Sequence, residues 1–462
     1  MATIIKRKKK YSVVYYYFDE KGEKKQKWET CQDYASAKKL KAEIEHQINN
    51  GSFIPPQKLT VKELLEDFVK IYGRTHWALS TFQSNVALIA NYINPTIGNE
   101  LVQNITARYV DEYYVDLQRV KSIANRHHKP KNEYLSPHVI NEIHKLLRCA
   151  FDQAVKWDII ARNPFPNANK PKVEYKKRDI WTADMIRTAL DNCEDMKLYV
   201  AMNLSFACSL RFGEISGLTW SNVFITEKHI LNDDAHLLVT QELSRASKEA
   251  RDLLNDKDIY FVFPSMMQNT HTNLILKKPK TESSIRKVWI PKTLSYILLE
   301  WKSIQDKYKE YLGSDYYDYD LVLTLPNGRP VESRVIDKEF KKLKEKANLP
   351  HVVFHSLRHS STTYKLKLNH GDLKATQGDT GHSQIDMITD VYAHILDEDR
   401  KINAQKFEAT FYAQNLGNPL RDVKPPQEDN PELNNLLSAL QQSPELVSML
   451  TQLMKGNELT IS

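Results

Sequence analysis

The sequence predicts a multidomain protein: a small β-sheet-plus-helix N-terminal module, an all-α bundle and a mixed α+β domain. The chain has 462 residues, which is too long for one ordinary hydrophobic core. Two Pro-containing stretches, "SFIPPQKLT" and "NPFPNANKPKVEYKKRD", interrupt it. Between these breaks the apolar pattern changes from strand-like to helical and then to a mixture of both. We place the domains at residues 1–52, 60–165 and 176–413, followed by an acidic, leucine-bearing tail at 416–462.

The N-terminal module is predicted from "YSVVYYYFDEKGEKKQKWET", which reads as two strands around an Asp-Glu-Lys-Gly turn. A helix follows, with Asp33 as its N-cap and an apolar face, and it ends at "NNG". The first 50 residues carry twelve Lys and Arg against seven Asp and Glu. Lysines can simply protect an edge strand from aggregation, but charge concentrated on so short a module favours contact with DNA.

The all-α bundle is predicted from two helix starts with capping signals. "TVKELLEDFV" opens with a capping box formed by Thr60 and Glu63. "SPHVINEIHKLLRCAFDQAV" opens with Ser136 as N-cap and Pro137 in the first turn, and its apolar residues recur at helical spacing. Between these helices lies the basic segment 119–131. Two interpretations of that segment are equally good: it contacts the phosphate backbone of a nucleic acid, or it is simply a solvated loop.

The mixed α+β domain is predicted to begin with a helix capped by Thr182. Three short strands are expected in "HLLVTQEL", "VWIPK" and "LVLTLPNGRPV", the last with an Asn-Gly turn. The tail holds two similar segments, "PELNNLLSAL" and "PELVSMLTQL". Each is predicted to form a short amphipathic helix that packs on its own domain or on a neighbouring protomer.

Composition narrows the class of protein. Hydrophobic residues make up 41% and charged residues 27% of the chain, as in soluble globular proteins. No apolar run has the length of a membrane span, and "MATIIKRKKKY" lacks a signal-peptide core. The four cysteines are scattered and match no metal or disulfide spacing. We therefore expect a cytoplasmic, nucleoid-associated protein with no membrane partner.

Candidate site residues lie in five stretches of the third domain: "CSLRFGEISGL", "KKPKTESSIRKVWIP", "FHSLRHSSTTY", "TGHSQ" and "ITDVYAHIL". In "FHSLRHSSTTY" an imidazole and a guanidinium lie three apart at a predicted helix start, where an anion is favoured. Each stretch also has an ordinary structural interpretation: Arg211 can form an ion pair with Glu214, and the "PKTE" segment can be a charged hairpin turn. Taken in chain order, the side chains that carry chemistry are Arg211, Lys280, His355, Arg358, His382 and Tyr392.

This ordered set resembles the catalytic set of the tyrosine recombinases, the phage integrase family. The resemblance covers the whole third domain, and extends more weakly to a helical core-binding domain and an N-terminal arm-binding module. It implies that the third domain is a tyrosine-recombinase catalytic domain. Two departures stand out: Ser209 occupies a position where glycine is frequent, and Thr380 one where leucine is usual. Neither removes a functional group.

The resemblance also implies the chemical roles. Arg211 and Arg358 hold nonbridging phosphate oxygens, and His382 donates another hydrogen bond. Tyr392 is the nucleophile, with His355 as base, and Lys280 protonates the departing 5′ oxygen. The product is a 3′-phosphotyrosyl link, formed with no cofactor and no metal. The expected partners are double-stranded DNA carrying attachment sites, a homotetramer on that DNA, and a directionality or DNA-bending accessory protein.

An integrase of a mobile element has three alternatives, of which the first is set aside and the other two stay open. Metal-dependent nuclease chemistry would need ligands such as Asp315, Asp318 and Asp320, but "SDYYDYD" is better interpreted as a solvated turn. A type IB topoisomerase uses a similar catalytic set, but the modular layout argues against it. A catalytically silent DNA-binding accessory protein is disfavoured by the intact set.

Overall fold

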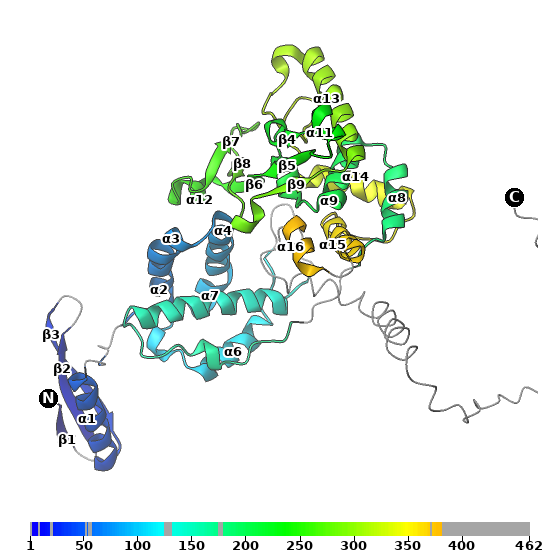
Figure 1. Cartoon of the computed structure of the whole chain (residues 1–462). Coiled ribbons are helices and arrows are strands. Elements are labelled where there is room, and N and C mark those ends of the chain that lie inside the picture. Colours follow the sequence, from blue (N-terminus) through cyan, green and yellow to red (C-terminus); the bar gives the residue numbers. More distant parts are fainter. Residues whose placement is uncertain are drawn as a thin grey trace, which may run out of the picture. The chain divides into compact units, whose positions relative to one another are not determined.

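The N-terminal module is a three-stranded antiparallel sheet with one helix packed on it (Figure 1). The structure is a computed structural model, and it describes residues 2–7, 10–18, 22–50, 53, 58–123, 132–173, 179–369 and 372–380. The module's elements are β1 Thr3–Arg7, β2 Lys10–Phe18, β3 Lys24–Cys31 and α1 Tyr34–Asn49.

The pairing within this module follows the predicted turn. Strand β2 pairs with β3 in a register that places Phe18 opposite Lys24, so the predicted two strands are confirmed. Strand β1, which the sequence analysis missed, pairs with the other edge of β2. The Asp33 side chain accepts the backbone N–H of Ser36 at 2.7 Å and caps α1, as predicted. The module has its own small core, which includes Val13, Tyr15 and residues of α1.

The second region is all-helical, as expected from its capping signals. Two of its helical runs contain π-helical turns, at Phe68–Gly73 and Ile89–Ile93. The helices are α2 Val61–Asp67, α3 Arg74–His76, α4 Leu79–Leu88, α5 Asn94–Ile97, α6 Ala107–Leu117 and α7 Pro137–Lys156, with 3₁₀ turns at Val102–Asn104 and Phe165–Asn167.

The predicted caps of the bundle are present. Thr60 accepts the backbone N–H of Glu63 at 3.3 Å, and the Glu63 carboxylate accepts the N–H of Thr60 at 2.8 Å, which completes the capping box. Ser136 caps α7 with Pro137 in its first turn. The apolar stripe of α7, including Ile143, lies in the core of the bundle.

The third region mixes helices with two small antiparallel sheets, ordered β4-β5-β9 and β6-β8-β7. Its strands are β4 Val223–Phe224, β5 His236–Val239, β6 Glu242–Ser247, β7 Ile259–Val262, β8 Thr272–Lys277 and β9 Arg286–Trp289. Its helices are α8 Ala183–Asp191, α9 Met196–Ala207, α10 Phe212–Gly217, α11 Glu227–Leu231, α12 Lys248–Leu253, α13 Lys292–Leu312, α14 Ser333–Lys346, α15 Ser356–Leu368 and α16 Leu373–Thr380, with 3₁₀ turns at Trp220–Asn222, Glu282–Ser284 and Gly313–Asp315.

Three strand predictions in this region need correction. "HLLVTQEL" is not one strand but two, β5 and β6, which belong to different sheets. The segment with Lys280 and Thr281 is not a hairpin turn, because β8 pairs with β6 and β7 whereas β9 pairs with β5. "LVLTLPNGRPV" forms only isolated bridges, Thr219 to Leu321 and Thr324 to Pro330, around the Asn-Gly turn. For β5, β6, β8, β9 and Leu321, a pairing partner is distant in sequence, and local pattern does not specify it.

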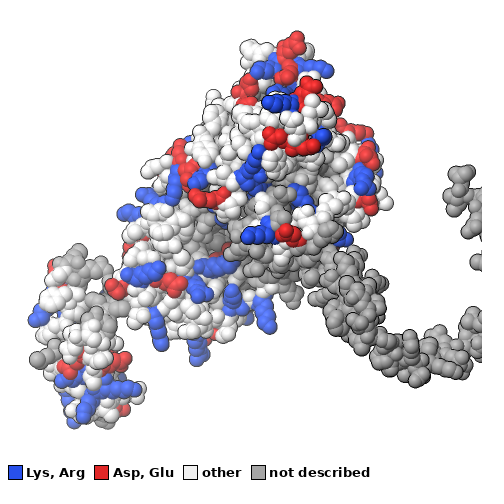
Figure 2. Space-filling view, viewed as in Figure 1, with Lys and Arg blue, Asp and Glu red and all other residues white. Residues whose placement is uncertain are grey.

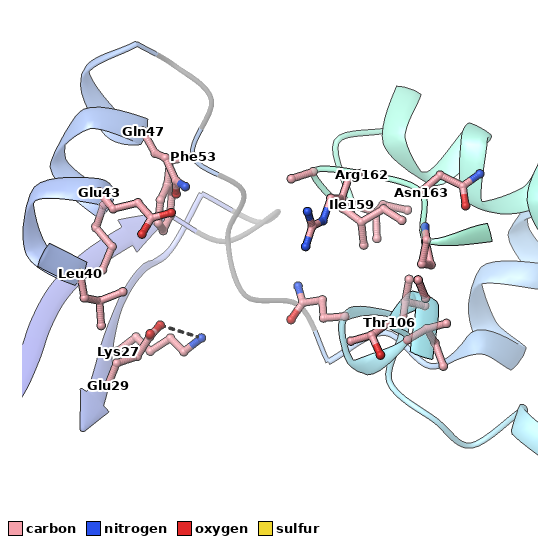
Figure 3. Close-up of a pocket in the computed structure, with 18 of the residues that line it drawn as sticks. Lys27, Glu29, Leu40, Glu43, Gln47, Phe53, Thr106, Ile159, Arg162 and Asn163 are labelled. Atoms are coloured by element: carbon pink, nitrogen blue, oxygen red, sulfur yellow. Dashed lines mark ion pairs between the residues drawn. The ribbon is translucent and has the colours of Figure 1, made fainter. Parts of the chain in front are cut away.

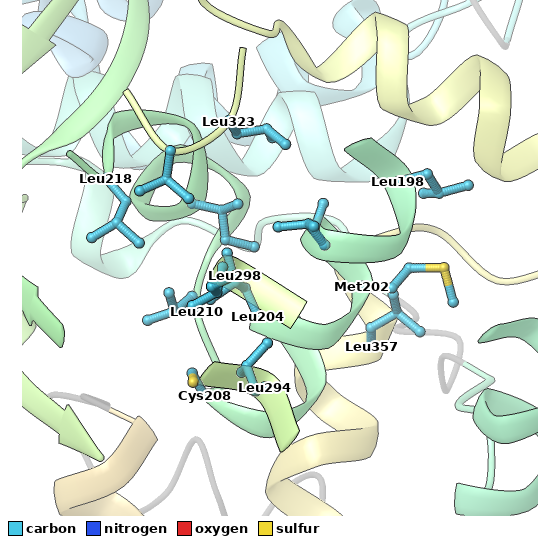
Figure 4. Packing of buried hydrophobic residues seen from close by; sticks show 14 of the residues in the cluster. Leu198, Met202, Leu204, Cys208, Leu210, Leu218, Leu294, Leu298, Leu323 and Leu357 are labelled. Atoms are coloured by element: carbon cyan, nitrogen blue, oxygen red, sulfur yellow. The ribbon is translucent and has the colours of Figure 1, made fainter. Parts of the chain in front are cut away.

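A hydrophobic core lies beneath the helices that carry the candidate site residues. Figure 4 shows leucines from α9, α13 and α15 meeting there with the segment that leads into α10. Leu204, Leu210, Leu298 and Leu357 are fully buried. Burying each such side chain contributes about 1.5–3 kcal/mol relative to leaving it exposed. The core therefore fixes the starts of α10 and α15 relative to one another.

The core of the helical bundle also contains residues from the third region. Ala246 of β6, Ala250 and Leu254 at α12, and Ile275 of β8 are all buried in the same cluster as the bundle helices. The Lys257 ammonium, just beyond α12, donates to the backbone carbonyl of Thr75 at 2.9 Å. The segment from β6 to β8 thus packs against the bundle, a contact that the sequence analysis did not predict.

Several predicted features lie outside the described residues. They include His382, Tyr392, most of the basic segment 119–131, and the leucine-bearing tail. Within the described part of the chain, no helix is both long enough and apolar enough to cross a membrane.

We expect Gly328→Ala to destabilise the protein by at least about 2 kcal/mol. Gly328 has a φ of +80°, and a Cβ atom there would lie 2.2 Å from the backbone oxygen of Tyr317. The matched control is Gly313→Ala, since Gly313 has a φ of +52° but open space around its Cβ position. It should lose less than Gly328→Ala, because only backbone strain of about 1–3 kcal/mol at its φ of +52° and ψ of −118° opposes the alanine. Urea unfolding measures both variants, and equal losses would contradict the steric argument.

Candidate active site

Arg211 and Glu214 form the first part of the candidate site at the start of α10. The Glu214 carboxylate accepts the backbone N–H of Arg211 at 3.0 Å and its guanidinium Nη1 at 2.7 Å. Glu214 is 2% exposed, whereas the Arg211 side chain remains about one-third exposed. The ion pair expected from the sequence is present, and it leaves part of the Arg211 guanidinium at the surface.

Arg286 of β9 binds the same carboxylate from another direction. Its Nη2 lies 3.1 Å from Oε2 of Glu214, and its Nη1 lies 3.3 Å from Oε1. Nη1 also donates to the backbone carbonyl of Ser284 at 2.9 Å. A two-point pair between a guanidinium and a carboxylate fixes orientation as well as charge.

Arg358 is the most deeply buried cation of the group, at 1% exposure. It lies in the first turn of α15, and its guanidinium donates to the backbone carbonyl of Ser209. Its Nη1 is 3.9 Å from Oε2 of Glu214. Burial, together with repulsion from Arg211 and Arg286, lowers the pKa of Arg358 to about 9, although Glu214 acts in the opposite direction.

The carboxyl of Glu214 responds to two opposed effects. Burial would raise its pKa, but Arg286 and then Arg211 lie against it and hold the pKa below its ordinary value of 4.5. Three guanidinium groups therefore converge on one ionised carboxylate. Cations held this close repel one another, and an anion that binds among them relieves that repulsion.

Ser209, one of the two departures from the usual family pattern, has an unusual backbone. Its φ is +53°, in the left-handed region that glycine adopts without strain. Its hydroxyl lies 2.6 Å from that of Ser361 on α15, and both residues are buried. The hydrogen bond joins the segment before α10 to α15, and the same residue's carbonyl receives Arg358.

Along the chain, Lys280 and His355 both lie between Arg211 and Arg358. His355 is exposed at the N-terminus of α15, and its ring meets that of His359 edge to face at 4.9 Å. Lys280 is exposed on the segment between β8 and β9. The next residue, Thr281, has its hydroxyl 2.9 Å from that of Ser284, which accepts from Arg211 at 3.3 Å.

The structure thus brings four of the six predicted residues onto connected elements. Arg211 and Arg358 meet through Glu214, and Lys280 and His355 lie on the segments that flank them. His382 and Tyr392 lie outside the described residues, so their positions remain predictions.

The aspartates considered as metal ligands have other partners. Asp318 pairs with Lys309, and Asp320 accepts the backbone N–H of Ser221 at 3.0 Å. The described residues contain no group of three or more His, Cys, Asp or Glu that can hold a metal ion. The solvated-turn interpretation of this segment is the one that fits these contacts.

A pocket of about 600 Å³ lies away from the arginine group (Figure 3). Tyr15, Glu43 and Phe53 line one side of it, and Val102 and Arg162 contribute to the other. None of the predicted site residues lines this pocket, so we do not assign the chemistry to it.

Comparison with known proteins identifies the third region. Residues 181–399 match the phage integrase family. Over these residues, which hold the arginine group, the chain is therefore similar to the phage integrase family. It is 25% identical to a tyrosine recombinase XerC-like protein of Caldanaerobacter subterraneus subsp. tengcongensis, over 80% of this chain and 87% of that one. It is 23% identical to the ICEBs1 integrase of Bacillus subtilis, over 66% and 75% of the two chains.

A solved structure shows the same fold. The Tn1549 transposon integrase, in complex with a circular intermediate DNA, superposes with a TM-score of 0.55. The match has 18% sequence identity and covers 76% of this chain and 99% of that one. The likeness supports a fold with several domains.

Sequence reasoning missed Arg286 as a member of this site. A signal was available: Val288 and Ile290 alternate as buried residues from β9 onward, so Arg286 faces the same side of the strand. An arginine on an inward-facing position needs a partner, because an unpaired buried charge is costly. The neighbouring Ser284 was missed for a different reason, since a small hydroxyl carries no pattern of its own.

We expect Glu214→Gln to destabilise the protein by about 3 kcal/mol at pH 7, because it leaves buried arginines without their carboxylate. Glu214 has a lowered pKa in the folded state, so its contribution is present above pH 4.5 and is lost as pH falls through the folded value. The stability gap between wild type and variant should therefore narrow in acid.

Urea unfolding between pH 7 and pH 3.5 measures this gap. Glu332→Gln is the control, since Glu332 forms a half-exposed pair with Arg245, which contributes about 0–1 kcal/mol. A gap for Glu214→Gln that stayed constant with pH would show that the carboxylate charge is not responsible.

Proposed function

We propose that the chain is a site-specific integrase of a mobile element, which cuts and rejoins DNA through a 3′-phosphotyrosyl intermediate. The observation that supports this most directly is the convergence of three guanidinium groups on Glu214, beside the segment with Lys280 and the helix start with His355. Phosphodiesters are anionic, and charge builds on their nonbridging oxygens as they react. Preorganised cations stabilise that charge.

In this proposal Arg211 and Arg358 hold the two nonbridging oxygens of the scissile phosphate. Arg358 is charged but crowded by other cations, as its lowered pKa of about 9 reflects. A phosphate group that binds between the arginines relieves part of this repulsion. Its phosphorus atom becomes more electrophilic, because the arginines withdraw charge from the nonbridging oxygens. His382 is proposed to donate a further hydrogen bond to the same group.

The strand is cut when the Tyr392 hydroxyl oxygen bonds to phosphorus and the bond from phosphorus to the 5′ oxygen breaks. At an unperturbed pKa of ~10, only about one tyrosine in a thousand is ionised at pH 7, and ionising it costs about 4 kcal/mol. His355 is proposed to take the phenolic proton and Lys280 to give one to the 5′ oxygen. The phosphotyrosyl bond keeps the energy of the phosphodiester, so a 5′ hydroxyl from another strand can reverse the step.

A DNA substrate trapped after the first step tests this function. A duplex nicked next to the cleavage point loses its short 5′-hydroxyl fragment and accumulates the covalent adduct, which migrates slowly on a denaturing gel. We expect such an adduct with wild-type protein in EDTA.

Activity that disappears in EDTA and returns with magnesium would point instead to nuclease chemistry. Relaxation without exchange between two attachment sites would favour a type IB topoisomerase, and binding without an adduct would favour a silent accessory protein.

The N-terminal module is proposed to bind arm-type DNA sites. Helix α1 covers the sheet face with Val13 and Tyr15, so alternate residues face the other side. On that side the guanidinium of Arg7 lies 4.3 Å from the Trp28 ring centre. The ammonium of Lys24 lies 4.7 Å from the centre of the Tyr16 ring, also on that side. Cations held over aromatic rings present charge to a phosphate backbone on a rigid support.

Figure 2 shows Lys and Arg side chains gathered over α6 and α7 of the helical region as well. We propose that this region is the core-binding domain, that residues from 176 onward form the catalytic domain, and that the protein acts as a homotetramer on its attachment sites. A directionality or DNA-bending accessory protein is a further proposed partner.

Deleting residues 1–55 should spare cleavage of a short core substrate but lower recombination between full attachment sites at least about tenfold. Loss of the module removes contacts with separate DNA sites and leaves the arginine group intact. Cleavage and recombination are measured on the two substrates in parallel. Equal losses on both would mean that the module belongs to the core-binding unit.

A further inference from the structure

Arg286 has contacts that reach beyond Glu214. Its Nη1 and Nη2 atoms bind the carboxylate, and Nη1 also donates to the backbone carbonyl of Ser284, two residues earlier. The Arg286 side chain is 7% exposed, so these contacts are shielded from water and well oriented. One buried guanidinium therefore joins the start of α10 to the segment that precedes β9.

That segment carries Lys280. The hydroxyl of Thr281 lies 2.9 Å from that of Ser284, and the Ser284 hydroxyl accepts from Nη1 of Arg211 at 3.3 Å. The backbone N–H of Ser284 also donates to the carbonyl of Thr281 at 3.0 Å and closes a tight turn. Lys280 thus immediately precedes a turn that is bound to both Arg211 and Arg286.

The ends of this segment belong to different sheets. Strand β8 pairs with β6 and β7, and β9 pairs with β5. A hairpin would set the position of its own turn through shared ladder bonds, but these two strands share none in the described pairing. The backbone N–H of Lys278 donates to the carbonyl of Asp258 at 2.9 Å, which holds the β8 end of the segment. The contacts that join the segment to the arginines are those of Ser284 with Arg211 and Arg286.

We propose that Arg286, acting through Ser284, is a positioning residue that holds the Lys280 segment against the Arg211–Glu214 pair. This inference rests on the proposed function, in which Lys280 protonates the departing 5′ oxygen. In this proposal Arg286 does not contact the phosphate. It keeps the proton donor in place relative to the arginines that hold the phosphate.

If Arg286 had a purely structural role, its loss would affect the cleavage rate in a different way. If Arg286 only neutralised Glu214, its loss would disturb Arg211 and slow the reaction whatever the leaving group. If it positions the Lys280 segment, its loss should matter only when the leaving group needs a proton. A displacement of about 1 Å can cost 10²-fold in rate, so the two cases can be separated by changing the leaving group.

The experiment compares two nicked duplex substrates in single-turnover cleavage. One has an ordinary 5′ oxygen at the scissile bond, and the other has sulfur in its place. A thiol has a pKa near 8.5, so the thiolate departs without a proton donor. Lys280→Ala serves as the reference, with an expected loss of at least about 10²-fold on the oxygen substrate and recovery with sulfur.

Arg286→Lys keeps a positive charge but cannot form the two-point contact with Glu214. We expect it to be slower by roughly 30-fold on the oxygen substrate and within about threefold of wild type on the sulfur substrate. Ser284→Ala leaves the Arg286–Glu214 pair in place and removes only the hydroxyl bridge. It should show a smaller loss, roughly fivefold, with the same recovery. Because the Ser284 carbonyl still accepts from Arg286, this variant tests whether the turn that joins Lys280 to Arg211 holds the proton donor in place.

Arg251→Lys is the matched control. Arg251 is also a shielded arginine with a two-point contact, to Asp256 at 2.8 and 3.0 Å, but it lies on α12. Its variant should cleave both substrates like wild type. Equal slowing of Arg286→Lys and Ser284→Ala on both substrates, or no slowing on the oxygen substrate, would overturn the inference. Absence of any wild-type adduct would instead refute the proposed function.

Discussion

Tyr392→Phe should abolish the covalent protein–DNA adduct and reduce strand cleavage by at least about 10⁴-fold. The change removes one oxygen atom, the proposed nucleophile, and leaves the aromatic ring. We therefore expect no residual pathway of comparable rate. The measurement is adduct formation on the nicked duplex, followed over hours on a denaturing gel.

Binding to the same duplex is the companion measurement for this variant. Because affinity comes mainly from many phosphate contacts, loss of one hydroxyl should change the dissociation constant by less than about threefold. Tyr412→Phe provides a matched control, since it makes the same chemical change elsewhere in the chain. An adduct that persists in Tyr392→Phe and disappears in Tyr412→Phe would reassign the nucleophile.

Arg358→Ala should slow cleavage by about 10³-fold while leaving duplex binding close to wild type. Arg358 is buried at the start of α15 and is proposed to hold a nonbridging oxygen whose charge increases in the transition state. Arg358→Lys should recover only part of the rate, because an ammonium cannot contact both the phosphate and the Ser209 carbonyl with a fixed fork.

Single-turnover cleavage and binding titrations over a range of salt concentrations test this expectation. Removing one phosphate contact should lower the slope of log affinity against log salt by about one. Arg329→Ala is the control, because Arg329 stacks over Tyr317 and donates to the carbonyl of Pro264. A cleavage rate within tenfold of wild type for Arg358→Ala would remove Arg358 from the proposed phosphate site.

Local signals in the sequence predicted local structure well. The caps at Asp33, Thr60, Ser136 and Thr182 are all present, because a cap depends only on residues within one turn of the helix. Strand pairing was predicted less well. The break between β5 and β6, and the passage of the Lys280 segment from one sheet to another, depend on partners distant in sequence.

The candidate site also divides into features that nearby residues determine and features that depend on residues distant in sequence. Arg211, His355 and Arg358 were predicted from motifs in which the neighbouring residues carry the information. The structure places His355 and Arg358 at a helix start as expected, and Arg211 also lies at the start of a helix. Arg286 was missed because its partner, Glu214, is 72 residues away. The left-handed backbone of Ser209 could not be predicted either, since serine seldom adopts it and the stabilising hydroxyl comes from Ser361.

The burial of Ala250, Leu254 and Ile275 in the core of the helical bundle bears on how this enzyme can be dissected. A fragment cut at the basic Pro-Lys stretch near residue 175 would expose these side chains and remove an inner surface from the bundle. Chimaeras that exchange the bundle with that of another recombinase face the same difficulty, since α12 would meet a foreign surface. The natural unit for transplantation is the bundle together with β6, α12, β7 and β8. These strands and this helix pack against the bundle but lie far from it along the chain.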